Sequence, residues 1–513
     1  MKPKHLLLGS VAVGTGVALT RSLFTATGRP HRSPASPSFD AIDAFLERQL
    51  RRLRIPGAAF AIIEGDRVVH QRGFGHARPG GEVPSLRTPF ALGSTTKSFT
   101  ALAVMQLVEA GTIELEAPVR RYLPWFRVAD PEASARMTVR HLLNQTSGLS
   151  MVAGTAVLGD IDGKPVSPER QARALSTLKL SRPVGTTFQY CNLNYNLLGL
   201  IVEAASGQSY AAYLREHIFK PLGMRHTFTT RAEARRHGLA QGHRYWFGFP
   251  IPAPEIPFPP GSLAAGGLVS TGEDLSRYLM ALLNGGRLGE ARILSRAGIA
   301  AMQHAAADQR ILGKVVTSYG MGWFISPVDG TKLVSHGGNL PEFSSFLGLL
   351  PERKRAIVLL TNADHGLPFV LSEVGEGIGA LLAGHQPPPI RFGFLPWMMR
   401  ASLFIPFSQL AGLFATLRHL RRWSGRAASH PRREPPWRPV VVPLGADLML
   451  LALLGYLRFS GLLRFMNLYF PDLAWIARIS GGLAWIGSVV RSGWGVSILG
   501  GMRGRGPVQK GNR

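Results

Sequence analysis

The chain has 513 residues, of which 45% are hydrophobic and 17% are charged, and this balance excludes a disordered protein and allows a large core. Its formal charge of +27 would suit a nucleic-acid binder. However, residues 1–38 carry +5 and residues 391–513 carry +14, which leaves +8 for the residues between them. Both ends also contain apolar segments, and positive charge beside such segments usually reports membrane topology. We therefore expect no nucleic-acid partner.

The N-terminus has the pattern of an export signal. Residues 1–28 begin with two lysines, followed by an apolar stretch at 6–19 that is short for a spanning helix, so a signal peptide or an N-terminal anchor is expected. Residues 29–38 are rich in Pro, Ser and Arg and predict a linker. Either form of the N-terminus would place the next domain outside the cytoplasm. Cys191 is the only cysteine, so no intrachain disulfide can stabilise that domain.

Strand-like and helix-like patterns alternate over residues 39–390. Strands are expected at both ends and helices between them, which predicts an α/β (α+β) domain whose sheet is completed by the two ends of the segment. The stretches that carry this pattern are a hairpin in 57–75, helices ended by glycine in 98–111 and 194–207, and two strands around a charged turn in 344–364.

The composition shifts after residue 390, and residues 391–513 predict a membrane region with about three transmembrane helices. The expected spans are residues 401–417, 439–457 and 473–490. The connection between the first two spans is short and strongly basic, and the C-terminal tail is also basic. The positive-inside rule therefore puts both basic stretches in the cytoplasm. We expect a protein of the cell membrane whose 39–390 domain is extracytoplasmic.

The alternative is that these segments are core helices of a soluble domain, because their lengths are near the threshold for spanning and Pro406 and Pro443 interrupt them. Asp447 and Arg478 lie inside the apolar stretches. Charged residues are costly in lipid. We therefore expect them to pair, to line a functional interface, to reach the headgroups, or to mark a wrongly placed boundary.

The short sequence "GSTTKS" places Ser94 three residues before Lys97, at the start of a predicted apolar helix. Residues three apart lie on the same helix face, and a desolvated amine can activate a serine that is otherwise a poor nucleophile. The same spacing occurs at Ser176 and Lys179, near the end of a predicted helix, where the dipole has the wrong sign for an oxyanion. Taken alone, Ser94 would more often be a helix N-cap.

Two further patterns change that balance. Tyr190 and Asn192 form the only Y-x-N in the chain, and His336 begins the only H-x-G, at the end of an apolar stretch that predicts a strand. In this order, and with the flanking stretches "HLLNQTSGL", "AAGGLVSTGEDLSRYL" and "SYGMGW", the chain resembles the serine β-lactamase and penicillin-binding-protein superfamily. It is most similar to the class C type branch of carboxypeptidases, esterases and D-amino-acid hydrolases. The resemblance covers about residues 40–382.

The resemblance implies a fold and a set of roles. The implied fold is a β-lactamase/transpeptidase-like domain with an antiparallel sheet flanked by helices and a helical subdomain. Ser94 would be the acylated nucleophile and Lys97 its proton partner. Tyr190 would relay protons to the leaving group, a role for which Lys97 would have to lower the pKa of the phenol. Asn192 would bind Lys97 and a substrate carbonyl.

The remaining expected site residues lie around the H-x-G motif. The N–H groups of Ser94 and Asn339 would form the oxyanion hole, beside Gly338. Taken alone, Tyr190 would more often be a packed aromatic residue and His336 a structural hydrogen-bonder. Many relatives that bind penicillins have a lysine at the position of His336, and histidine is mostly neutral at pH 7. We therefore expect an ester, amide or D-amino-acid peptide substrate and weak β-lactamase activity.

Two hypotheses of different class follow. The first is a membrane-anchored extracytoplasmic serine hydrolase that acts through a Ser94 acyl-enzyme, with cell-wall peptides as the natural substrate. The alternative is a catalytically weak penicillin-recognising or peptide-binding membrane sensor. No cofactor is expected, and the sequence contains no cluster with metal-ligand spacing. The expected partners are a small-molecule or peptide substrate and membrane lipid, and the sequence does not predict an oligomeric state.

Overall fold

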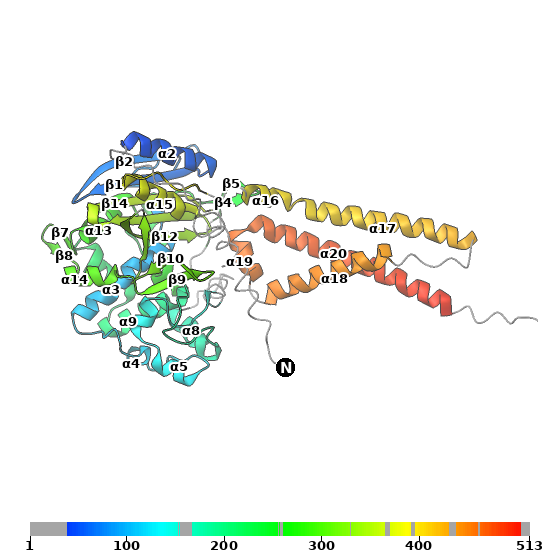
Figure 1. Ribbon diagram of the computed structural model, residues 1–513, viewed down its shortest axis with the longest axis horizontal. Helices are drawn as coiled ribbons and strands as arrows, with labels where there is room; N and C mark the ends of the chain where they lie inside the picture. The colour runs from blue at the N-terminus through cyan, green and yellow to red at the C-terminus, as the bar shows by residue number, and fades with distance from the viewer. Residues whose placement is uncertain are drawn as a thin grey trace, which may run out of the picture. The chain divides into compact units, whose positions relative to one another are not determined.

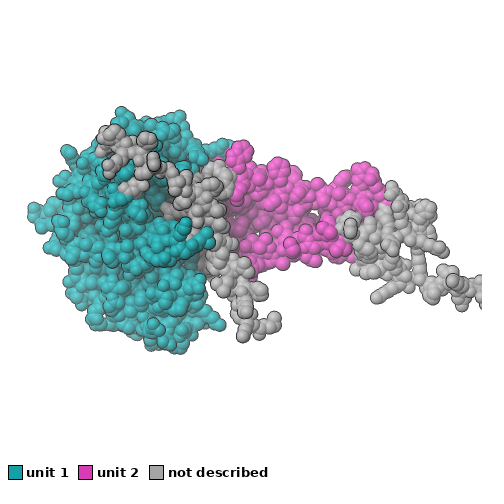
Figure 2. Space-filling view, in the orientation of Figure 1, with its two compact units in different colours: residues 1–245, 249–393 teal, residues 246–248, 394–513 magenta. Residues whose placement is uncertain are grey.

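The computed structural model describes residues 38–151, 153, 167–254, 256, 260–328, 330–364, 370–390, 395–429, 438–459 and 462–503. Two compact units divide the chain (Figure 2): residues 1–245 with 249–393, and residues 246–248 with 394–513. The expected export signal or anchor in 1–28 and the linker in 29–38, apart from its last residue, lie outside the described residues.

An eight-stranded sheet organises the first unit (Figure 1), in the order β2-β1-β14-β13-β12-β11-β10-β9. The predicted hairpin β1–β2 pairs through β1 with β14, so the two ends of the domain complete one antiparallel sheet, as predicted. Strand β12 lies near the middle of the sheet and carries the H-x-G motif. The strands are β1 (Gly57–Glu64), β2 (Arg67–Gly75), β9 (Ala307–Ile311), β10 (Lys314–Tyr319), β11 (Phe324–Val328), β12 (Thr331–Leu340), β13 (Phe343–Leu350) and β14 (Arg355–Thr361).

Helices cover both faces of this sheet (Figure 1). Helices α2 (Phe39–Arg52) and α15 (Val370–Leu382) pack on one face around a separate apolar cluster. The larger helical region lies on the other face, where α3 (Thr96–Glu109), α9 (Asn192–Ser206) and α13 (Gly272–Leu283) share the main core. The predicted mixed fold with an antiparallel sheet and flanking helices is therefore confirmed.

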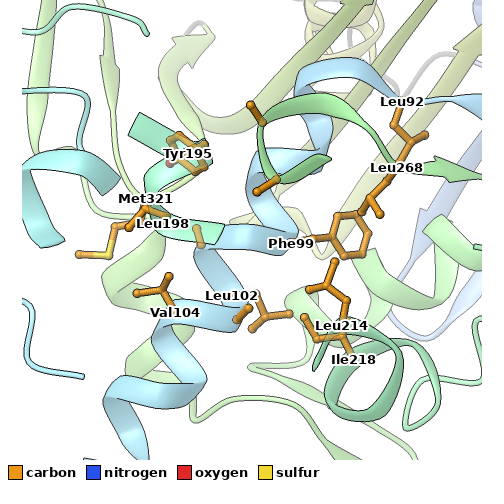
Figure 3. Close-up of a cluster of buried hydrophobic side chains, with 14 of the residues drawn as sticks. Leu92, Phe99, Leu102, Val104, Tyr195, Leu198, Leu214, Ile218, Leu268 and Met321 are labelled. Carbon is orange, nitrogen blue, oxygen red and sulfur yellow. The ribbon is translucent and has the colours of Figure 1, made fainter. Parts of the chain in front are cut away.

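Helix α3 is the central helix of that region. Its residues from Thr96 to Met105 are all buried, and Figure 3 shows Phe99 and Leu102 of this helix among apolar side chains from neighbouring segments. The predicted glycine terminators of α3 and α9, Gly111 and Gly207, both have positive φ, at 72° and 71°, a conformation that glycine adopts without strain. Because residues 96–105 are all buried, a polar side chain in the first turns of α3 is enclosed by protein.

Shorter elements connect these layers. The helices and 3₁₀ or π turns are η1 (Gly93–Thr95), α4 (Val119–Tyr122), α5 (Pro131–Arg136), α6 (Val139–Leu143), α8 (Pro168–Arg173), η2 (Ala174–Thr177), α10 (Tyr210–Leu214), η3 (Arg215–Phe219), α11 (Arg231–Arg236), η4 (Pro260–Ser262), α12 (Leu263–Gly266), α14 (Arg296–Met302) and η5 (Pro351–Arg353). The small sheets contain β3 (Phe90–Ala91), β4 (His243–Trp246), β5 (Phe249–Pro252), β6 (Val269–Ser270), β7 (Arg287–Leu288), β8 (Ala291–Arg292) and β15 (Ala363–Asp364).

The second unit is helical. Three of its helices are long and apolar enough to cross a membrane, over Trp397–Arg422, Val440–Phe459 and Pro471–Trp494, in the regions predicted as spans. Only 6%, 6% and 33% of their most apolar windows are buried, which argues against the alternative that they are core helices of a soluble domain. The helices are α16 (Leu395–Ala401), α17 (Phe404–Ser429), α18 (Arg438–Phe459), α19 (Leu462–Tyr469) and α20 (Pro471–Arg503).

Asp447 and Arg478, the two charged residues predicted inside the apolar spans, both have partners. Asp447 of α18 forms a buried ion pair with Arg491 of α20, which also donates to Thr416 of α17 over 3.4 Å. Arg478 donates to Asn467. Of the roles considered for Asp447, pairing is the one observed. Its partner was not predicted, because the third predicted span ended one residue before Arg491, whereas the candidate span in the structure continues to Trp494.

Candidate active site

The junction between β3 and α3 brings Ser94 and Lys97 together. Gly93 has φ of 58° and leads into the turn η1, which positions Ser94, partly exposed, one helical turn before Lys97. The Lys97 side chain is fully buried. Its Nζ lies 3.0 Å from Ser94 Oγ, 2.8 Å from Asn192 Oδ1 and 2.6 Å from the carbonyl oxygen of Ala265. The S-x-x-K and Y-x-N motifs therefore meet at one amine.

The three contacts of Lys97 determine which side of its amine group faces Ser94 Oγ. The oxygens of Asn192 and Ala265 can only accept hydrogen bonds, so each takes one N–H of the amine. In the ammonium form the third N–H faces Ser94 Oγ. In the neutral form a lone pair faces the same oxygen and can accept its proton. Burial favours the neutral form, because desolvation lowers the pKa of Lys97 well below its usual value, and a smaller effect of Cys191 offsets this only in part.

Tyr190 is half-buried beside this pair, among aromatic rings. It stacks on Phe324 and meets Tyr319 edge-on, with ring centroids 6.3 Å and 6.4 Å away, and Lys97 Nζ lies 4.9 Å from its ring centroid. Burial, with a smaller effect of Tyr319, raises the pKa of Tyr190 well above its usual value, although a hydrogen bond with Ser94 opposes the rise. Desolvation of the phenol thus outweighs any lowering of this pKa by Lys97, which stays a prediction. The phenol of Tyr190 therefore keeps its proton at neutral pH.

Two glycines, Gly93 of η1 and Gly338 of β12, allow strand β12 to lie close to the backbone at Ser94. A Cβ at Gly93 would lie 2.8 Å from the backbone nitrogen of Asn339, and a Cβ at Gly338 would overlap the carbonyl oxygen of Leu92. Glycine at both positions lets the backbones of η1 and β12 lie in contact. The backbone around Ser94 and that of Asn339 are thus adjacent, as an oxyanion hole made from the N–H groups of these two residues requires.

His336 faces the same region but is withdrawn from solvent. Its side chain is 1% exposed. Nδ1 lies 2.7 Å from the carbonyl oxygen of Gly337, so this nitrogen carries the proton, and Nε2 lies 3.3 Å from the hydroxyl of Tyr319. Burial, with a smaller effect of Lys97, lowers the pKa of His336 to about 3. The ring is therefore neutral and contributes no permanent cation to the site.

The second S-x-x-K pair stays apart from this cluster. Ser176 lies in η2, and both Ser176 and Lys179 are exposed. Within the described part of the chain, no group of three or more His, Cys, Asp or Glu side chains is arranged to hold a metal ion. A surface hollow of about 610 Å³ includes Gln106, Tyr213 and His217 in its lining and contains none of the predicted site residues.

Sequence reasoning missed three groups that shape the site. The Ala265 carbonyl belongs to the quoted stretch "AAGGLVS", but a backbone oxygen has no residue-type signal. Gln145, in "HLLNQTSGL", is fully buried, and its Oε1 accepts from the backbone nitrogen of Cys191 over 3.0 Å, which fixes the Y-x-N segment. Asp364 accepts from the side-chain nitrogen of Asn339 over 2.8 Å. The two flanking stretches that contain Ala265 and Gln145 thus contact the motif residues.

Comparison with known proteins agrees with this geometry. The family model described as Beta-lactamase matches residues 42–375. "Penicillin-binding protein 4" of Amycolatopsis lactamdurans is 33% identical over 339 residues, which are 65% of this chain and 87% of that protein. The chain belongs to the β-lactamase family of serine hydrolases and penicillin-binding-protein homologues.

Solved structures show the same fold. The octameric penicillin-binding protein homologue from Pyrococcus abyssi is 30% identical, with a TM-score of 0.61 over 71% of this chain and 82% of its own. A class C β-lactamase mutant is 18% identical, with a TM-score of 0.55 over 67% of this chain and 96% of its own. The second likeness concerns the fold alone, and it supports the class C type of architecture that the motif order predicted.

Proposed function

We propose that this chain is a membrane-anchored serine hydrolase whose 39–390 domain works outside the cytoplasm through a Ser94 acyl-enzyme. The observation that carries this proposal is the environment of Lys97. Two obligate acceptors, Asn192 Oδ1 and the Ala265 carbonyl, hold the buried amine so that its remaining position faces Ser94 Oγ at 3.0 Å. A helix cap serine would need no such partner.

The proposed reaction follows from the positions of the protons. Neutral Lys97 accepts the proton of Ser94 as Oγ attacks the substrate carbonyl, and the N–H groups of Ser94 and Asn339 stabilise the oxyanion. Tyr190 then donates its proton to the leaving group, and the proton that Lys97 took from Ser94 passes to the Tyr190 phenolate, which restores the neutral amine and the phenol. Water attacks the acyl-enzyme in the reverse sense, with the same groups returning the proton to Ser94.

The substrate class follows from the charge of the site. His336 is neutral and buried, and its two ring nitrogens face Gly337 and Tyr319. A carboxylate of the substrate would therefore find no permanent positive charge at this position. We therefore favour an ester, an amide or a D-amino-acid peptide bond that has no carboxylate beside the bond to be cleaved over a penicillin.

The location rests on the C-terminal helices. Three apolar helices of spanning length, with the excess of arginine after the first of them and in the tail, support an arrangement in which both basic stretches are cytoplasmic. An odd number of spans then leaves the catalytic domain on the other side, where cell-wall peptides occur.

The test is intact-mass spectrometry of the full chain in detergent micelles after incubation with a fluorophosphonate. A single adduct on the parent and none on Ser94→Ala would support Ser94 as the activated nucleophile, and Ser176→Ala is the matched control because it removes the other S-x-x-K serine. An adduct that persists on Ser94→Ala would refute the assignment. With penicillin as the probe, a stable adduct and no released product would instead favour the sensor.

A further inference from the structure

The one-turn helix α12 supplies the Ala265 carbonyl that contacts Lys97, so its position matters for the proposed base. Such a short helix has little stability of its own. Contacts with α3 hold it from both ends: the backbone nitrogen of Leu268 donates to Thr96 Oγ1 over 3.3 Å, and Thr100 Oγ1 donates to the Ala264 carbonyl over 2.7 Å. The peptide next to that carbonyl carries the Ala265 oxygen.

The hydroxyl of Thr100 takes part in a directed chain of hydrogen bonds. Besides Ala264, it lies 2.6 Å from the hydroxyl of Tyr210 and 3.4 Å from the Thr96 carbonyl. A hydroxyl has one proton, and the Ala264 carbonyl is the nearer of the two obligate acceptors. Tyr210 must therefore be the donor to Thr100. Burial raises the pKa of Tyr210 above its usual value, so this donor stays protonated.

The same region is tightly packed against the helix that carries the other acceptor of Lys97. A Cβ at Gly199 of α9 would lie 2.7 Å from the Cβ of Ala264, so α12 and α9 are already in contact. Helix α9 begins at Asn192, whose Oδ1 binds Lys97. A shift of α12 away from α3 would thus open the Lys97 site, and the packing on α9 gives little room to absorb it.

We propose that Thr100 and Tyr210 are positioning residues of the active site. They touch neither Ser94 nor the groups proposed to bind substrate. Their hydrogen bonds hold the segment of Ala264 and Ala265 so that one amine proton of Lys97 is always engaged and the lone pair of the neutral amine is aimed at Ser94. This inference rests on the proposed function and adds two residues to the machinery that it requires.

Loss of the Thr100 hydroxyl has two predicted effects. The Ala264 carbonyl loses its donor and the Ala265 carbonyl loses its fixed place, so the amine is misaligned, and misplacement by about 1 Å can slow a reaction by about a hundredfold. A carbonyl acceptor also favours the ammonium form of Lys97. Its loss lowers the pKa of Lys97 further, so the acid limb of the pH–rate profile moves to lower pH.

The experiment measures the rate of fluorophosphonate labelling of Ser94 against pH, on the full chain in micelles. Thr100→Val should label at least about tenfold more slowly, with the acid limb at lower pH. Thr100→Ser keeps the hydroxyl and should restore the parent rate. Tyr210→Phe should slow labelling in the same direction, whereas Tyr213→Phe should not. Tyr213 lies on the same helix α10, and its hydroxyl has no hydrogen-bond partner among the residues that the structure describes.

The outcomes separate the two proposals. If Thr100→Val keeps the parent's thermal transition and also its labelling rate and pH profile, the positioning role is refuted while the proposed function stands. If Thr100→Val does not fold, Tyr210→Phe decides, because it removes only one oxygen atom: parent-like labelling refutes the role, and slowed labelling with a shifted limb supports it. If the parent itself is not labelled at Ser94, the proposed function and this inference are both refuted.

Discussion

Gly338→Ala should disable the proposed oxyanion hole while leaving Ser94 and Lys97 in place. A Cβ at position 338 would overlap the Leu92 carbonyl oxygen and press on Ser345 Oγ, and it falls about 1 Å inside the 3.0 Å limit that real Cβ contacts keep. That carbonyl cannot turn aside easily, because it accepts from Ser345 Oγ over 2.5 Å and from Thr95 Oγ1 over 3.1 Å. Strand β12 must therefore move away from η1.

The move would carry the N–H of Asn339 away from that of Ser94. Loss of one oxyanion donor costs about 10²–10³ in rate, or about 2.7–4 kcal/mol, so acylation by an activated p-nitrophenyl ester should fall by about that factor. The matched control is Gly337→Ala. A Cβ there would meet the hydroxyl of Ser372, which can rotate away, so the loss should be small. Equal acylation rates for parent and Gly338→Ala would refute this reasoning.

Two further predictions concern charged groups. The rate of acylation should rise with pH as Lys97 loses its proton and reach its plateau well below 10.5, because burial lowers the pKa of Lys97. An inflection at the ordinary lysine value would contradict this, and His336→Gln should leave the inflection in place because the pKa of His336 is about 3. In the second, helical unit, Asp447→Asn or Arg491→Met alone should cost about 3–5 kcal/mol of stability in micelles by stranding a buried charge, whereas the double variant should recover much of that loss. Thermal transitions of the three variants decide, and no recovery in the double variant would show that the pair is not coupled.

Local geometry explains which part of the site the sequence predicts. Ser94 and Lys97 are three residues apart at the start of a helix, so their contact follows from helix geometry alone. The meeting of Asn192 with Lys97 is not local, and it was expected only from the order of motifs in a known family. The fold was similarly predictable because hairpins, glycine-terminated helices and apolar strands are local patterns, whereas the pairing of β1 with β14 depended on recognising that the domain's two ends share a sheet.

The groups that were not predicted act through the backbone or through burial. Nothing in the residue type of Ala265 indicates that its carbonyl binds Lys97. Gln145 contacts Cys191 across 46 positions of the chain, a pairing that no periodicity encodes. Arg491 lies one residue beyond the third predicted span, yet it forms a buried ion pair with Asp447 of the second. Tertiary contacts decide each of these cases.

Burial gives the two proposed proton carriers opposite roles. Desolvation disfavours the charged form of any group, so the same enclosed site pushes the pKa of Lys97 down and that of Tyr190 up. At neutral pH both groups tend toward their uncharged forms, which are an amine with a free lone pair and a phenol with its proton. Environments that push two pKa values apart define a base and an acid. In the proposed mechanism, Lys97 therefore needs no third group to remove its proton, and Tyr190 needs no cation to be useful, because it is required as a donor before it is required as an acceptor.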